Sequence, residues 1–311
     1  MHQIMHATIL HATILAAFLV FSRTPVSMSA AGIALFLIAL WVAKTDLAQA
    51  RGLDKIVVLS NLCFAVPLAV FGAEHFADSK DIMQIVPSYM PWHLFWTYFV
   101  GVALMATALS VATRIRVRWS GLLFGIMMFA FDAMLTLPAL RTSLHNRIVW
   151  ALLLREPSFG GGGWILAASA LAGWRAEGRS WLITVGRLLI AVAAIFYGVE
   201  HFLHPLGMPG IPLEKEMPTW IPGRVVIDYL TGAILLVCGA GILVAKKTRM
   251  AATYLGTWIV LMVVLVYGPV LIAALADPST DVKVEGLNYF FDTLLFAGAI
   301  LALASATPRT D

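Results

Sequence analysis

Gly72-Ala73-Glu74-His75-Phe76 ends one apolar stretch of the chain, and Gly198-Val199-Glu200-His201-Phe202 ends a second one 126 residues later. A polar loop follows each copy, and a segment bounded by two prolines follows each loop, at 87–91 and at 218–222. A Tyr-x-x-Gly then begins seven residues after the second proline, at Tyr98 and at Tyr229, which are 131 residues apart. The second copy therefore holds five extra loop residues (131 − 126). The shared order of these residues predicts an internal duplication.

The composition predicts an integral membrane protein. Hydrophobic residues make up 60% of the chain, charged residues 12%, and the mean hydropathy is +0.88, whereas a soluble domain is about 25% charged. Long continuous apolar runs favour membrane-spanning helices over a barrel, whose strands alternate in polarity. The net charge of +4 does not indicate nucleic acid, because the basic residues lie in short loops, where positive charge sets membrane topology. Cys63 and Cys238 lie inside apolar runs without a C-x-x-C, which disfavours thiol chemistry.

The expected fold is all-α and polytopic, with about ten transmembrane helices. Two N-terminal helices, within 1–54, precede two four-helix units of the same orientation, at 55–175 (unit one) and 181–306 (unit two). The first helix is either a membrane span or a signal peptide that ends near residues 27–30. The predicted spans are 4–22 and 29–45, then 55–76, 93–113, 118–140 and 158–175 in unit one, and 181–203, 224–245, 250–276 and 286–306 in unit two.

The distribution of basic residues predicts how these spans are oriented. Twelve Lys and Arg residues lie in loops on the side of the N-terminus and eight on the other side. The tight turns at 114–118 and 246–249, which are rich in Arg and Lys, fall on the same side. Because cytoplasmic loops carry the excess of positive charge, we expect a multi-pass protein of the bacterial cytoplasmic (inner) membrane with both termini in the cytoplasm. The Glu-His motifs then face outward.

Ionisable residues within membrane spans are costly and are therefore functional candidates. A glycine three residues before His75 and before His201 predicts close approach by another helix or by a ligand. The alternative is that each Glu-His pair caps the end of its helix. The candidates inside the predicted spans are Glu74, His75, Asp132, Arg187, Glu200, His201, Asp228 and Asp292.

The candidates divide between the two units. Asp132 with Glu74 and His75 forms a predicted protonatable cluster in unit one. Glu200, His201 and Asp228 form the corresponding cluster in unit two. Tyr98 and Tyr229, two turns into the next helices, either donate hydrogen bonds into these sites or are core residues with satisfied hydroxyls. The proline-bounded segments are interpreted as an amphipathic stretch on the outer surface, or as a lid over a pocket.

Two further patterns give no strong site. His201 and His204 are three residues apart, but unit one has Asp78 in place of the second histidine, and we predict no metal site. The run from Gly160 to Gly163 is expected to be a flexible or closely packed helix start. A nucleotide-binding loop is excluded because no strand precedes the run.

The repeated unit resembles the DoxX-like membrane protein family. Gly-x-x-His-Phe at the end of the first helix, a proline-bounded loop and Tyr-x-x-Gly in the second helix are similar to that family, over roughly 55–175 and again over 181–306. The family is named for a small membrane subunit of a thiosulfate:quinone oxidoreductase. The resemblance implies a membrane module that works with a redox partner protein. The tandem form and the two N-terminal helices depart from the usual single unit.

These patterns lead to one functional hypothesis and two alternatives. The hypothesis is a membrane module of a redox system that binds a quinone or another apolar ligand near the Glu-His motifs. His75 and His201 would bond its carbonyl oxygens, while Glu74 and Glu200 would exchange protons with the outer face. The alternatives are a non-catalytic scaffold or lipid-binding protein and a small-molecule transporter. Units of four helices share one orientation, which excludes an inverted repeat, and the absence of a decisive catalytic motif leaves enzymatic activity open.

Overall fold

The computed structural model describes residues 23–170, 176–211 and 215–308. Within these ranges the regular secondary structure is helical, with no β-strand, as the apolar runs predicted. The first predicted span, 4–22, lies outside the described residues. The helices are α2 (Arg23–Gln49), α3 (Asp54–Val58), α4 (Ser60–Ala77), α5 (Ser79–Ile82), α6 (His93–Thr113), α7 (Val117–Phe131), α8 (Leu137–Thr142), α9 (Arg147–Ser169), α10 (Ala176–Leu203), α11 (Arg224–Leu243), α12 (Thr248–Met262), α13 (Gly268–Ala276) and α14 (Thr280–Ala306), with the π-helical turns η1 (Asp132–Thr136) and η2 (Val263–Tyr267).

Among the described residues, seven helices are long and apolar enough to cross a membrane. The chain is therefore a multi-pass membrane protein, although the expected count of about ten is not confirmed. The seven are α2, α6, the continuous stretch of α7 to α8, α10, α11, the stretch of α12 to α13, and α14. The two remaining long helices, α4 and α9, lie in the middle of the bundle, where both contact α14.

Several predicted boundaries were wrong. The second predicted span, 29–45, lies inside a longer helix, α2, that begins at Arg23 and ends at Gln49. The predicted span 55–76 is divided at Leu59 into α3 and α4. The last helix begins six residues earlier than 286, at Thr280. The fourth helix of unit one begins at Arg147 rather than at 158, because Arg155-Glu156-Pro157 lies within the helix. The glycine run at 160–163 is therefore inside α9 and not at a helix start.

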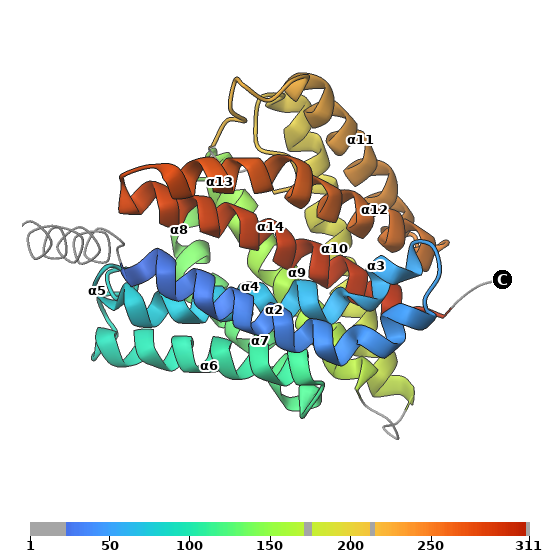
Figure 1. Cartoon of the computed structure of the whole chain (residues 1–311), viewed down its shortest axis with the longest axis horizontal. Coiled ribbons are helices and arrows are strands. Elements are labelled where there is room, and N and C mark those ends of the chain that lie inside the picture. The colour runs from blue at the N-terminus through green and yellow to red at the C-terminus, as the bar shows by residue number, and fades with distance from the viewer. Residues whose placement is uncertain (1–22, 171–175, 212–214, 309–311) are drawn as a thin grey trace, which may run out of the picture.

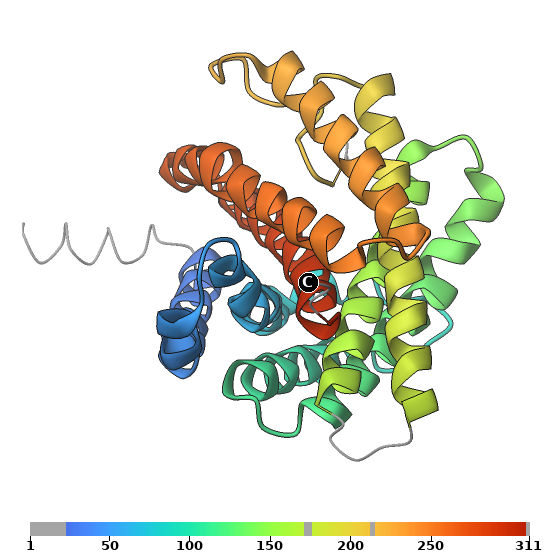
Figure 2. The same ribbon diagram turned by 90° about the vertical axis from the view of Figure 1, so that its right-hand side faces the viewer.

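Helix α14 is the centre of the packing (Figure 1). It contacts α4 and α9 of unit one as well as α12 of its own unit. The view turned by 90° shows α14 between the N-terminal α2 and α4 on one side and α9 and α10 on the other (Figure 2). The first helix of each unit thus packs against the last helix of the other unit, α4 against α14 and α10 against α9. The two predicted units interleave rather than forming separate bundles.

The glycine run explains how α9 can touch so many neighbours. A Cβ atom at Gly162 would lie 2.5 Å from the Cβ of Ala299 in α14. A Cβ at Gly161 would lie 2.9 Å from the Cα of Gly186 in α10, and one at Gly163 would lie 2.8 Å from the ring of Phe124 in α7. Small residues permit such close approach of helices in membranes. Close packing, one of the two expectations for this run, is what the structure shows.

Both units share backbone features at a spacing of 131 residues. The π-helical turns start at residues 132 and 263, and a proline follows each of them at 138 and 269. Left-handed backbone conformations occur at Trp92, Arg114 and Arg116, and again at Gly223, Ala245 and Lys247. Each residue of the second set follows its counterpart by 131. The same helix ends and turns therefore recur in both units.

Candidate functional site

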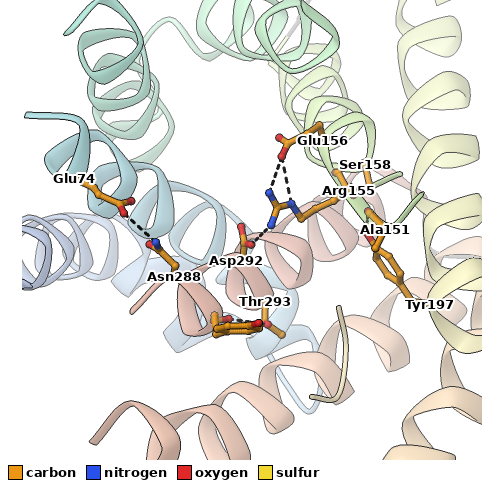
Figure 3. Close-up of polar contacts among 10 residues, drawn as sticks. Glu74, Ala151, Arg155, Glu156, Ser158, Tyr197, Asn288, Asp292 and Thr293 are labelled. Atoms are coloured by element: carbon orange, nitrogen blue, oxygen red, sulfur yellow. Dashed lines mark hydrogen bonds and ion pairs between the residues drawn. The ribbon is translucent and has the colours of Figure 1, made fainter. Parts of the chain in front are cut away.

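The centre of the bundle contains a buried ion-pair group. Arg155 of α9 is paired with the carboxylates of Asp292 in α14 and of Glu156 beside it, with 2.9 Å between Arg155 Nη2 and Glu156 Oε1 (Figure 3). These three side chains expose only 18%, 15% and 17% of their surface. Ser158 donates its hydroxyl to the Arg155 carbonyl at 2.7 Å, and Tyr197 of α10 donates to the Ala151 carbonyl at 3.0 Å.

Asp132 adds a third carboxyl to this group. It opens the π-helical turn η1, exposes 6% of its surface, and neither carboxylate oxygen has a well-aligned hydrogen-bond partner among the described residues. Its charge is close enough to Glu156 and Arg155 to interact with both. A π-helical turn bulges the backbone and is frequent at functional sites.

Glu74 joins the group from α4. Its Oε1 accepts a hydrogen bond of 2.9 Å from Nδ2 of Asn288, one turn before Asp292 on α14, and its charge is within reach of Asp292 (Figure 3). We call Glu74, Asp132, Arg155, Glu156, Asn288 and Asp292 the acidic cluster. Among the described residues it contains four carboxyls and one guanidinium.

The ion pairs of the acidic cluster lie well below the helix ends, whereas Glu74 lies three residues from the end of α4 at Ala77. We call the end of the bundle that carries the connections 78–92, 143–146, 204–223 and 277–279 the loop side. Arg155 is eight residues from the start of α9 and Asp292 twelve from the start of α14. At about 1.5 Å per residue these positions are about 12 and 18 Å below the loop side. A hydrocarbon core is about 30 Å thick, so these ion pairs are at membrane depth.

Unit two holds a different buried pair. His201 of α10 and Asp228 of α11 are both fully buried, with 3.2 Å between Nδ1 and Oδ1. His201 Nε2 accepts the backbone N–H of Gly210 at 2.9 Å. In the neutral ring the proton must therefore lie on Nδ1, facing Asp228. His201 Nδ1 and Asp228 Oδ1 are not aligned for a hydrogen bond. Their contact is therefore electrostatic.

The loop of unit two folds inward over this pair. Met208, Ile211, Met217 and Ile221 of the loop are buried. The hydroxyl of Tyr267, in the π-helical turn η2, donates to the Pro209 carbonyl at 2.7 Å. Gly210 has a φ of +108°, which side chains rarely adopt. The described part of this loop thus covers His201.

The loop of unit one stays at the surface. Ile85, Tyr89 and Trp92 expose 62%, 71% and 77% of their surface, and His75 lies half-buried in α4 behind them. Its Nδ1 is 2.7 Å from the Phe71 carbonyl. Because a carbonyl only accepts, Nδ1 carries the proton, and Nε2 of the neutral ring is an acceptor.

The glycines of the two motifs serve helix packing. A Cβ at Gly101 would lie 2.9 Å from the Cβ of His75, and one at Gly232 would lie 2.9 Å from the Cβ of His201. A Cβ at Gly72 would lie 3.2 Å from the Gly101 carbonyl oxygen, and one at Gly198 would lie 3.0 Å from the Gly232 carbonyl oxygen. The close approach predicted from Gly72 and Gly198 is therefore made by a helix, α6 in unit one and α11 in unit two. Each histidine is held where the first two helices of its unit meet.

The two tyrosines are on the outside of the bundle. Tyr98 and Tyr229 expose 40% and 41% of their surface and lie against Phe76 and Phe202, with ring centroids 6.0 and 5.6 Å apart. The Tyr98 hydroxyl is 3.3 Å from that of Ser79. The structure does not bring either tyrosine to the acidic cluster or to the His201–Asp228 pair.

Glu200 and Arg187 have local partners. Glu200 Oε2 lies 3.4 Å from Arg147 Nη1 and 3.6 Å from His204 Nε2. Arg187 donates to the carbonyls of Ile242 and Leu243 at 2.6 and 2.8 Å, at the end of α11. Arg187 therefore caps the C-terminal end of α11. A positive charge stabilises that end because the helix dipole is negative there.

A depression of about 330 Å³ lies at the opposite end of the bundle, between Asp46, Asp54 and Arg249. Its charges are paired with each other or with helix ends. Arg249 is 2.8 Å from Asp54 and donates to the Ala304 and Thr307 carbonyls. The charged residues of this depression serve structural contacts, and its lining does not include the acidic cluster.

The sequence analysis missed Arg155, Glu156 and Asn288. The orientation prediction counts Arg155 among the loop residues. The apolar run at 148–154 that precedes the pair was the available signal, together with Asn146, whose side chain accepts the Ile148 N–H and caps α9.

Comparisons with protein-family models, with curated proteins and with solved structures find no match for this chain.

Proposed function

We propose that this protein binds and exchanges protons inside the membrane, at the acidic cluster. The observation that carries the proposal is the surplus of carboxyls over guanidinium, four against one, in the buried centre of the bundle. An unpaired charge costs several kcal/mol when it leaves water. Arg155 offsets one negative charge, and protons relieve the remainder at the lowest cost. Ionisable residues placed this way are typical of proton relays in pumps and transporters.

Asp132 is the group that most needs a proton. It is 94% buried, since 6% is exposed, and both of its oxygens lack a well-aligned hydrogen-bond donor. Arg155 is occupied by Asp292 and Glu156. A protonated Asp132 would satisfy the site with one O–H donor and no net charge.

A second candidate is the redox module with an apolar ligand, favoured by Nε2 of His75, the ring nitrogen that is not bonded to Phe71. A neutral ring bonded to Phe71 through Nδ1 accepts a hydrogen bond at Nε2. This ring would bind the hydroxyl of a hydroquinone in preference to the carbonyl of a quinone. This second proposal also includes membership of the DoxX-like family and a redox partner protein. It further includes a location in the bacterial inner membrane with both termini in the cytoplasm.

Infrared spectroscopy of the purified protein tests proton binding. A protonated carboxyl has a C=O stretching band distinct from that of a carboxylate, and the band shifts in heavy water. We expect such a band at neutral pH and a weaker one in Asp132→Asn and in Asp292→Asn. Glu285→Gln is the matched control, because Glu285 pairs with Lys215 at 2.6 Å outside the cluster. A spectrum without the band, or a band unchanged in both cluster variants, would overturn the proposal.

A further inference from the structure

We propose that protons reach the acidic cluster along the interface between α4 and α14, and that Glu74 transfers them between the loop side and Asp292. This inference rests on the proposed function of the cluster. Glu74 is the residue that exchanges protons, and the access route passes the first of the two Glu-His motifs. The transferred species is a proton.

Polar residues follow one another along this interface, and one side-chain hydrogen bond joins the two helices. Asp78 lies one turn after Glu74 on α4, and its backbone N–H bonds to the Glu74 carbonyl at 2.7 Å. Residues four apart share a helix face, so Asp78 and Glu74 lie one above the other. On α14, Asn288 and Asp292 are also four apart, and Asn288 donates to Glu74 at 2.9 Å. The series runs from Asp78 to Glu74, Asn288 and Asp292.

The outer end of the series is open to water and acidic. Asp81 and Asp281 are exposed, Asp78 is half-buried, and the charges of all three interact. Partial burial and the nearby carboxylates of Asp81 and Asp281 raise the pKa of Asp78 above its ordinary value. A carboxyl with a raised pKa holds a proton at higher pH and is better matched to proton transfer near neutrality.

The inner end of the series has a free acceptor. Asn288 Oδ1 has no hydrogen-bond partner among the described residues, and the same is true of both oxygens of Asp132. Asp132 is buried, and the cation near its carboxylate is Arg155. Arg155 is already paired with Asp292 and Glu156. The unsatisfied carboxyl of Asp132, independent of the surface acids, indicates that a proton is bound within the acidic cluster that the route serves.

The corresponding route in unit two is blocked. Glu200 is held by Arg147 and His204 at 3.4 and 3.6 Å, so its charge is already balanced. One turn deeper on α10, Tyr197 donates its hydroxyl to the Ala151 carbonyl at 3.0 Å and is not free to pass a proton. His201 is closed off by Gly210. Glu74 and Glu200 occupy matching motifs but differ in what they contact.

The test is the rate of proton exchange at the cluster. After rapid mixing with heavy water, the infrared band of the cluster carboxyls shifts as deuterons replace protons. We expect Glu74→Gln to slow this shift roughly 100-fold, the low end of the contribution of a positioned acid–base group. Glu74→Asp keeps a carboxyl and should restore most of the rate. Glu200→Gln is the matched control and should leave the rate unchanged.

The outcomes separate this inference from the proposed function. A wild-type rate in Glu74→Gln, or a slow shift in Glu200→Gln alone, overturns the access route while leaving proton binding intact. The absence of a cluster band in the wild-type protein overturns the proposed function itself. If Glu74→Gln fails to fold, the Asp78→Asn variant, which removes the outer carboxyl, still tests the route and should slow the shift. A wild-type rate in Asp78→Asn would contradict the route.

Discussion

The two π-helical turns have matching positions and different neighbours. In unit one the turn begins with Asp132, which faces Arg155 and Glu156, and ends with Thr136. In unit two the same positions, 131 residues later, hold Val263 and Tyr267, and Tyr267 bonds to the inward loop at Pro209. One backbone feature thus places an acid in the interior of unit one and anchors a loop in unit two.

The histidines show the same contrast. His75 lies behind an exposed loop with one ring nitrogen bonded to its own helix, whereas His201 is fully buried between Asp228 and Gly210. The packing contacts between the first two helices are nevertheless alike in both units. Unit two is thus the closed unit: its loop covers His201, whereas the loop of unit one stays at the surface.

The largest expected effect comes from the arginine of the acidic cluster. Arg155→Leu leaves the buried carboxylates without a cation, which should lower the free energy of unfolding by about 3–5 kcal/mol. Arg187→Leu removes hydrogen bonds to two carbonyls at the end of α11 and should cost about 1.5–3 kcal/mol. Reversible unfolding in mixed detergent micelles measures both. Equal losses of unfolding free energy in the two variants would mean that Arg155 stabilises the protein no more than the helix cap of Arg187 does.

The two histidines should differ in stability. His201→Leu leaves the buried Gly210 N–H without its acceptor and should cost about 1–3 kcal/mol. His75→Leu removes one contact within α4 and should cost less, about 1 kcal/mol. The same unfolding experiment compares them directly. A greater loss in His75→Leu would reverse the assignment of unit two as the closed unit.

The anchoring role of Tyr267 is open to a smaller test. Tyr267→Phe removes the hydrogen bond to Pro209 and should cost about 0.5–1.5 kcal/mol. Limited proteolysis should then cut the 204–223 loop faster, while cleavage at 78–92 stays unchanged and serves as the internal control. Unaltered cleavage of both loops would show that buried methionines hold the loop without the tyrosine.

The smallest effect should be equal in the two units. Tyr98→Ala and Tyr229→Ala each remove one aromatic contact, with Phe76 and with Phe202. Such a pair contributes about 0.5–1.5 kcal/mol beyond burial. Similar losses in thermal unfolding would support matched packing of the units, and a large difference would limit the similarity to the backbone.

The helical fold and the motif contacts were predictable from local patterns. Apolar runs of bilayer length predict helices, and the glycines near the histidines predict close approach. The sequence also grouped His201 with Asp228, which the structure places in contact. These features depend on residues a few positions apart or on two consecutive helices.

The acidic cluster depends on pairings that local patterns do not contain. Arg155 meets Asp292 across 137 residues and Glu74 meets Asn288 across 214. Both contacts arise because helices of one unit pack against helices of the other. Arg155 and Glu156 also resemble loop residues beside Pro157, since the ion pairs that stabilise them inside a helix come from α14.

The most direct test of proton binding in unit one is a difference titration of wild-type protein against Asp132→Val. This substitution gives the first π-helical turn the residue found at position 263 in the second. We predict that the purified wild-type protein takes up one proton more than the variant as the pH is lowered from alkaline to neutral. Superimposable titration curves across that range would contradict the claim that the cluster binds protons.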